Sequence, residues 1–174
     1  MKIRRAEATD AKCIAKLHIN VWRDTYMGIM PDSLLDNMDI NEYEQRWSKT
    51  LKDPGKGRYL VVDAGKELVG FATFGPARDE DLEEMNSAEL VALNISSNYW
   101  RQNIGTDLLS TIIDSVKGNY KNLYLWVAEK NDRAISFYEK FGFIQDGKTK
   151  TGNSHGNIVE LRYVLQMTSL GLSH

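Results

Sequence analysis

Apolar residues recur at intervals of three and four positions in four stretches of the chain, and this spacing predicts amphipathic helices. In the first stretch Ile14, Leu17 and Val21 share one face, and Thr9 or Asp10 can cap its amino end. The predicted helices cover residues 10–26, 40–51, 104–116 and 131–141, with Pro54-Gly55 ending the second and Gly142 the fourth.

Runs rich in β-branched and aromatic residues lie between these helices and predict strands. The strands are expected at residues 2–6, 58–62, 68–74, 89–95, 123–127, 143–145 and 158–165. The segment Asp63-Ala64-Gly65-Lys66 is a short glycine-containing connection that predicts a hairpin, whereas a polar loop is expected between the last two strands. Because helices and strands alternate without an internal repeat, the pattern predicts one α/β domain.

The composition fits one packed domain. The chain has 174 residues, of which 42% are hydrophobic and 26% charged, so it can bury a core and has no signature of disorder. A net charge of -2 argues against a surface built for nucleic acid. No apolar run is long enough to span a bilayer, and no apolar signal segment follows the charged amino terminus, so we expect a cytoplasmic protein with no membrane partner.

Two segments that could suggest other chemistry have simpler explanations. Cys13 lies beside Ile14 and is expected to be a small buried apolar residue. It has no partner for a disulfide, and no Cys/His cluster has zinc spacing, so we expect no metal. The segment 152–156 spells G-x-S-x-G, but a nucleophile elbow needs a helix after it, and a polar loop leading into a strand is expected here.

The turn at residues 99–106 joins a predicted strand to a helix that begins at once. Free N–H groups at a helix amino terminus, helped by the helix dipole, can hold a phosphate. Gly105 allows a ligand to approach the backbone closely, and Asn103 tolerates a positive φ. The turn is therefore a candidate anion site, although turns of this kind are also common as plain connections.

A second segment follows the strand at residues 123–127 and carries the pattern N-x-x-A-x-x-F-Y-x-x-x-G-F. The pattern is matched at Asn131, Ala134, Phe137, Tyr138, Gly142 and Phe143. With the turn at residues 99–106, it resembles the GNAT superfamily of acyl-CoA-dependent N-acetyltransferases. The resemblance extends to residues 22–31 near the start and 160–163 near the end.

The resemblance implies a mixed, mostly antiparallel, strongly twisted sheet of six or seven strands flanked by about four helices. A V-shaped gap is expected between the strands that end at Ile95 and Val127. Residues 1–167 would form one N-acetyltransferase domain, followed by a short tail of residues 168–174. Two positions depart from the family turn, because Trp100 stands where Arg or Gln is usual and Asn103 stands where the first glycine is usual.

The resemblance also implies acetyl-CoA as the acyl donor and assigns residues to it. The expected donor-binding residues are Leu93, Asn94, Ile95, Arg101, Gln102, Asn103, Ile104, Gly105, Thr106, Asn131 and Tyr138. Lys130, Arg133 and Lys140 would lie near the nucleotide phosphates. The acceptor would be a small-molecule or peptide amine bound near Trp22 and Tyr26, and a homodimer is left open.

Acetyl transfer requires that the amine lose a proton and that the departing thiolate be protonated or solvated. Tyr138 is protonated at neutral pH and is the expected acid, and Glu89 is the expected base, directly or through water. The carboxylates from residue 79 to 84 either attract a cationic amine or form a solvated surface. The alternative to an N-acetyltransferase is a non-catalytic acetyl-CoA-binding sensor or interaction module.

Overall fold

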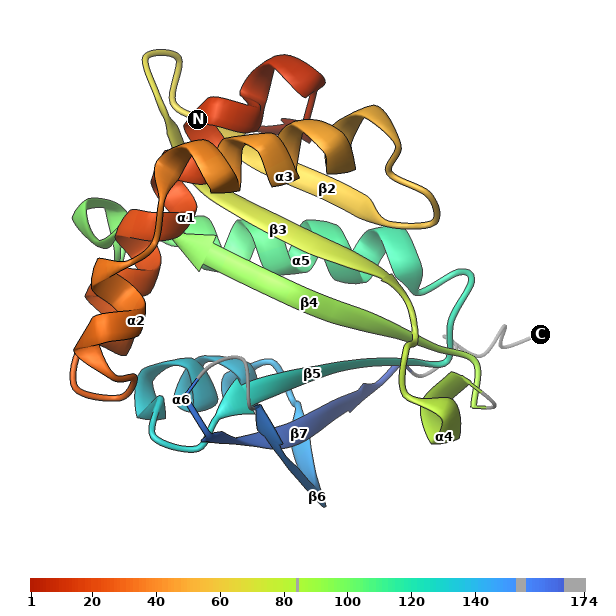
Figure 1. Ribbon diagram of the computed structural model, residues 1–174. Coiled ribbons are helices and arrows are strands. Elements are labelled where there is room, and N and C mark those ends of the chain that lie inside the picture. Colours follow the sequence, from red (N-terminus) through yellow and green to blue (C-terminus); the bar gives the residue numbers. More distant parts are fainter. Residues whose placement is uncertain (84, 153–155, 168–174) are drawn as a thin grey trace.

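A twisted seven-stranded sheet forms the centre of the protein in the computed structural model, which describes residues 1–83, 85–152 and 156–167 (Figure 1). The strands lie in the order β1-β2-β3-β4-β5-β7-β6, and every neighbouring pair is antiparallel except β4 and β5. Their bounds are β1 (Lys2–Arg5), β2 (Arg58–Asp63), β3 (Leu68–Pro76), β4 (Ser87–Ile95), β5 (Asn122–Ala128), β6 (Ile144–Gly152) and β7 (Ile158–Gln166).

Helices cover both faces of this sheet. On one face lie α1 (Ala11–Tyr26), α2 (Asp32–Asp36) and α3 (Ile40–Lys52), and on the other lie α5 (Ile104–Val116) and α6 (Asp132–Lys140). A short helix, α4 (Glu80–Glu83), and two 3-10 turns, Ala8–Asp10 and Ser97–Tyr99, complete the described helical elements. The protein is therefore one three-layered mixed α/β domain, as the resemblance implied.

The larger core lies between the sheet and α5. The helix buries Leu108, Leu109 and Ile112 completely, and these side chains pack with Leu90 and Leu125 of the central strands. Full burial of such a side chain stabilises the fold by roughly 1.5–3 kcal/mol. The apolar side chains whose spacing predicted this helix thus also pack it against β4 and β5, the two strands between which the gap opens.

The central strands β4 and β5 pair over only four residue pairs, from Ser87↔Asn122 to Leu90↔Leu125. The next residue, Val91, is a bulge: Leu90 faces Phe74 and Ala92 faces Thr73 on β3, so Val91 is the extra residue. A bulge bends its strand and increases the local twist. Beyond Leu90, β4 and β5 therefore diverge, and this is the gap that the resemblance implied.

The described helices and the hairpin largely follow the sequence predictions. The hairpin turn has Gly65 at a φ of 89°, and the Gly65 amide donates to Asp63 Oδ1 at 2.7 Å. The expected polar loop after Gln145 is wrong, because most of it belongs to β6, which runs to Gly152 and pairs with β7. Edge strands often carry lysines, and such a strand has no apolar face for a periodicity argument to find.

Cys13 is exposed, so the expectation that it would be buried is wrong. The side chains of Ile14, Leu17 and Val21 on α1 face the sheet, and Cys13 lies on the solvent side of the same helix. Among the described residues, no helix is long and apolar enough to cross a membrane. The expected tail, residues 168–174, lies outside the described residues.

Candidate active site

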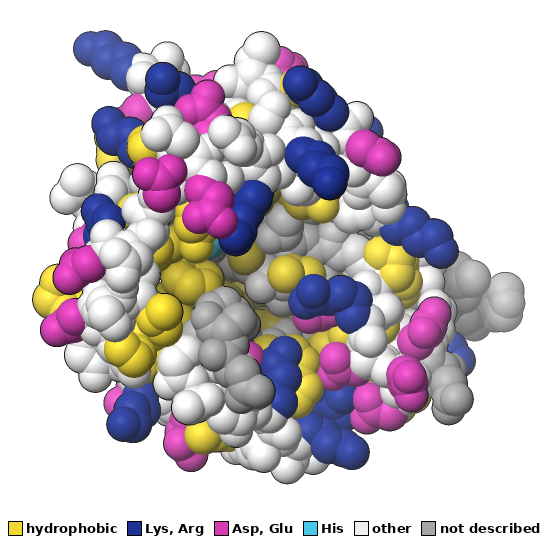
Figure 2. All heavy atoms as spheres, viewed as in Figure 1, with side chains coloured by type: hydrophobic (Ala, Val, Ile, Leu, Met, Phe, Trp, Pro, Cys, Tyr) yellow, Lys and Arg dark blue, Asp and Glu magenta, His cyan; other side chains and the backbone are white. Residues whose placement is uncertain are grey.

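A cavity of about 870 Å³ occupies the gap between β4 and β5. Residues 90–95 of β4 and 125–128 of β5 form its walls, and residues of α1, α5 and α6 line it on the two faces of the sheet. In Figure 2 the molecule is hollowed on the face that carries α1 and α2, and hydrophobic side chains gather beside the hollow. The cavity thus connects one face of the sheet with the other.

The β4 wall consists of the strand edge that β5 has left. Leu93, Asn94 and Ile95 line the cavity, as the sequence analysis expected. Their strand pairs with β3 on its other side, and no ladder with β5 exists beyond Leu90. Backbone N–H and C=O groups at a strand edge without a neighbouring strand can form hydrogen bonds with an extended, amide-containing ligand.

The turn before α5 has the backbone that the sequence predicted for Asn103. Asn103 adopts the left-handed conformation with φ 61° and ψ 4°, and Arg101 has a φ of 61° as well. Both residues line the cavity together with Ile104, Gly105 and Thr106. Gln102 is not among the lining residues, and its amide instead donates to the Asn98 carbonyl at 3.5 Å.

Gly105 packs against α6. A Cβ placed on Gly105 would lie 3.5 Å from Phe137 Cζ and 3.9 Å from Ile95 Cγ1, which is ordinary contact. The absent side chain would therefore point toward Phe137. An alanine would therefore fit at this position, and contact with Phe137 limits only larger side chains.

Trp100 uses its ring nitrogen within the protein. Its Nε1–H donates to the Ile95 carbonyl at 2.8 Å, and the Arg133 guanidinium lies over the indole with Cζ 3.3 Å from the ring centroid. Both side chains line the cavity. A cation over an indole face is a favourable arrangement. The departure at position 100 thus removes one donor from the turn and places the charge of Arg133 beside it.

On the α6 side, Tyr138 and Asn131 line the cavity as expected. Burial, and to a smaller extent Tyr26, raise the pKa of the Tyr138 hydroxyl well above its usual value. Asn131 Oδ1 accepts from the Ala134 amide at 3.2 Å, so the asparagine caps α6.

Glu89, the expected base, lies near the start of β4, as expected, but does not line the cavity. It is only 2% exposed. Its oxygens accept from Arg78 Nε at 2.6 Å and Nη2 at 2.7 Å, and the Tyr124 hydroxyl donates to Oε2 at 3.1 Å. Because Glu89 lies where β4 still pairs with β5, the gap begins just beyond it. Both carboxylate oxygens of Glu89 are therefore engaged by Arg78 and Tyr124.

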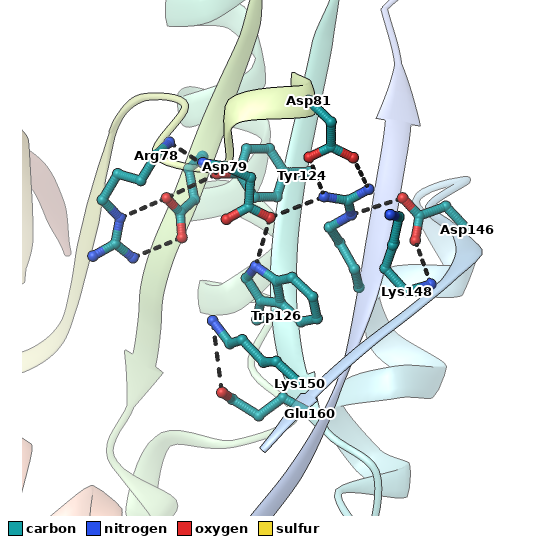
Figure 3. Close-up of polar contacts among 11 residues, drawn as sticks. Arg78, Asp79, Asp81, Tyr124, Trp126, Asp146, Lys148, Lys150 and Glu160 are labelled. Atoms are coloured by element: carbon teal, nitrogen blue, oxygen red, sulfur yellow. Dashed lines mark hydrogen bonds and ion pairs between the residues drawn. The ribbon is translucent and has the colours of Figure 1, made fainter. Parts of the chain in front are cut away.

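The acidic segment is largely tied to the sheet (Figure 3). Arg162 of β7 is 4% exposed, and its guanidinium donates to Asp79, Asp81 and Asp146 at 2.7–2.9 Å. Asp79 Oδ2 also accepts from Trp126 Nε1 at 3.1 Å. The described acidic residues of the segment do not line the cavity, and residue 84 lies outside the described part. Asp79 and Asp81 therefore hold α4 against β5 and β7.

Residues of α1 form the opposite end of the cavity. Trp22 and Tyr26 line it, as expected, together with Thr25. Within the described residues, the buried Thr25 Oγ1 has no hydrogen-bond partner, which is a group that a ligand could satisfy. Burial, followed by the nearby charge of Glu160, raises the pKa of Tyr26. Glu160 also lines the cavity, and the sequence analysis had not singled it out as a site residue.

The remaining motif, G-x-S-x-G at residues 152–156, begins with Gly152, the last residue of β6, and is followed by β7 from Ile158. These strands are antiparallel neighbours, so no helix follows the serine position, and residues 153–155 themselves lie outside the described part. Within the described residues, no three His, Cys, Asp or Glu side chains are grouped as metal ligands would be.

Comparisons with known proteins agree with this geometry. The model of the Acetyltransferase (GNAT) family matches residues 19–143. An N-acetyltransferase of Bacillus subtilis, the uncharacterised YuaI, is 33% identical over 80% of this chain and 78% of its own. A spermidine N(1)-acetyltransferase of Vibrio cholerae is 26% identical over 99% of this chain and 97% of its own.

Among solved structures, a PaiA N-acetyltransferase of Thermoplasma acidophilum, in complex with coenzyme A, has a TM-score of 0.70. It is 22% identical, and the match covers 92% of this chain and 96% of that one, so the likeness establishes the fold. Together with the family match over residues 19–143, these findings show that the chain belongs to the GNAT family of acetyltransferases.

Proposed function

We propose that this protein transfers an acetyl group from acetyl-CoA to a primary amine by direct attack, with both substrates bound at once. The observation that carries the proposal is the cavity through the sheet, with the buried residue Tyr138 in its wall. A donor can enter along one face and an acceptor along the other, because the cavity reaches both. The coenzyme A complex of the Thermoplasma relative supports the choice of donor.

The residues of the cavity fit such a donor. The β4 edge at Leu93 to Ile95, which pairs with no strand on the β5 side, can hydrogen-bond the amides of the pantetheine arm, except for the Ile95 carbonyl, which accepts from Trp100. The turn from Arg101 to Thr106, at the amino end of α5, suits the pyrophosphate. Arg133, which stacks on Trp100, adds positive charge beside this turn, and Lys140 also lines the cavity, whereas Lys130 does not.

When bound, acetyl-CoA supplies an activated acetyl thioester. The main task of Tyr138 is then to keep a proton at Oη, and its raised pKa ensures that it does so at neutral pH. From the cavity wall this hydroxyl can donate the proton to the sulfur that leaves. The Asn131 Oδ1 is used by the helix cap, so only its amide NH₂ can contact the donor.

The amine must give up its proton without help from Glu89, whose oxygens are held by Arg78. We assign this step to water in the cavity, which reaches the solvent on the α1 side. Direct transfer does not use Cys13, which is exposed and does not line the cavity. The proposal thus needs one protein acid and an open path for water.

A thiol-release assay with acetyl-CoA over a panel of amines tests the proposal, beside calorimetric binding of acetyl-CoA alone. We expect saturable binding of acetyl-CoA and turnover with at least one alkyl amine. Binding without turnover over the whole panel would contradict the proposal and favour a sensor. The spermidine acetyltransferase of Vibrio cholerae makes polyamines the first amines to try.

A further inference from the structure

A lysine ammonium of the protein itself lies at the edge of the cavity. Lys150 Nζ is 3.7 Å from Glu160 Oε2 and 4.3 Å from the centroid of the Trp126 ring (Figure 3). Glu160 and Trp126 both line the cavity. A carboxylate beside an aromatic face is a favourable environment for an ammonium group.

The strand register explains why these side chains meet. Lys150 of β6 is directly opposite Glu160 of β7, and Glu160 is opposite Ala128 of β5. Residues opposite one another share a face of the sheet, and Trp126, two residues before Ala128, lies on that face as well. The Trp126 ring is fixed by its hydrogen bond to Asp79.

The cavity is divided by charge. Among its described lining residues, Glu160 is the one carboxylate, whereas Arg101 and Arg133, which stacks on Trp100, lie at the turn that suits phosphates. A cationic ligand is therefore favoured at the β7 end and disfavoured at the other end.

The ion pair of Lys150 is loose. Its side chain is 43% exposed and that of Glu160 is 24% exposed, and an exposed pair at 3.7 Å contributes little to stability. A ligand ammonium can replace Lys150 at small cost. Tyr138 is only 8% exposed, so the position where Lys150 lies is nearer to the solvent than the site of transfer.

We propose that Glu160 and Trp126 form a subsite for a second ammonium group of the acceptor, which Lys150 occupies until a diamine or polyamine displaces it. The amine to be acetylated lies deeper, toward Tyr138. This inference rests on the proposed function and adds the class of acceptor, namely alkyl amines with two or more positive charges.

The test compares kcat/KM for butane-1,4-diamine and for butan-1-amine, which differ by one ammonium group. We expect the wild-type enzyme to prefer the diamine by about tenfold or more, and Glu160→Gln to abolish this preference through a higher KM for the diamine. Lys150→Met should lower the KM for the diamine. Glu129→Gln, an exposed glutamate that does not line the cavity, is the matched control and should keep the wild-type preference.

An unchanged preference in Glu160→Gln would overturn the subsite, and so would an equal loss for both amines, which would place Glu160 at the reacting nitrogen. If the wild type acetylates no amine, the proposed function fails, and calorimetry with butane-1,4-diamine then tests the subsite separately. Weaker binding of the diamine to Glu160→Gln than to Glu129→Gln would support it, and equal binding would overturn it. Thermal melting of each variant checks the fold.

Discussion

Arg133 at the start of α6 stacks on Trp100 in the turn before α5, with Cζ 3.3 Å from the ring centroid. This contact joins the two elements that flank the end of the cavity proposed for the donor. It also gives a physical reason why a tryptophan is tolerated at a position where the family usually has a phosphate-binding side chain. The charge comes from Arg133, and the ring of Trp100 positions it.

We therefore expect Arg133→Ala to weaken acetyl-CoA binding by about tenfold, the size of one lost charge-assisted contact. Trp100→Phe keeps a ring under the guanidinium and should cost less than Trp100→Ala. Calorimetric titration of acetyl-CoA measures these effects. Lys130→Ala removes a neighbouring charge that does not line the cavity, and it serves as the control. Equal affinities of the Arg133 and Lys130 variants would argue against the role of the stack.

Tyr138→Phe separates proton donation from packing. Phenylalanine keeps the ring that packs on Phe137 and Phe143 and removes only the hydroxyl. We expect kcat to fall by roughly 10²- to 10⁴-fold while the affinity for acetyl-CoA barely changes, provided that thiolate departure limits the rate. Full activity would make Tyr138 a packing residue. An equal loss of rate and of donor binding would show instead that the hydroxyl positions the donor.

Substitutions at Gly105 distinguish helix packing from ligand approach. In Gly105→Ala the new Cβ would be in ordinary contact with Phe137, so stability and donor affinity should stay close to those of the wild type. In Gly105→Val the extra methyl groups press on Phe137, and we expect a loss of about 1–3 kcal/mol in the free energy of unfolding together with weaker donor binding. Denaturant melts and calorimetry measure the two effects. Weaker donor binding by both variants at unchanged stability would mean that the glycine serves the ligand.

The anchor between β1 and α1 should depend on pH. Arg4 donates to Asp10 at 2.7 Å and 2.9 Å and lowers the pKa of that carboxyl. A carboxyl whose pKa is lower in the folded state stabilises the fold at a pH above its unfolded value, about 3.9, and the stabilisation is lost as the pH falls through the folded value. Asp10→Asn should therefore be less stable than the wild type at pH 7, with a difference that shrinks below about pH 4. A difference that is constant from pH 7 to pH 3 would contradict this.

Local rules carried the sequence analysis furthest. The left-handed Asn103, the turn at Gly65 and the spacing of Leu108 and Ile112 follow from the residues themselves, and the structure has them as predicted. The exposed strand β6 lacks an apolar face, so no periodicity marks it. Whether Cys13 is buried depends on the rotation of α1 about its axis. A spacing of three and four residues does not fix that rotation to within one position, so it does not separate Cys13 from its neighbour Ile14.

The site required tertiary information. Glu89 and Glu160 are both strand glutamates, and only the divergence of β4 from β5 leaves the first outside the cavity and brings the second into its wall. The partners Arg78 and Lys150 are likewise set by the register of the sheet and by chain segments distant in sequence. The motif around Tyr138 predicted residues of the α6 side of the cavity, because Ala134, Phe137 and Tyr138 lie on one helix that Asn131 caps.

The single extra residue at Val91 has a mechanical consequence. Because of this bulge, the part of the sheet formed by β1 to β4 and the part formed by β5 to β7 are connected through only four residue pairs, which can act as a short hinge. The extended arm of the proposed donor, bound between these two parts of the sheet, would supply the hydrogen bonds that β4 and β5 no longer form with each other. Donor binding should then slow amide hydrogen exchange at those edge N–H groups of residues 91–95 that face the gap, which makes the seam the most ligand-dependent part of the sheet.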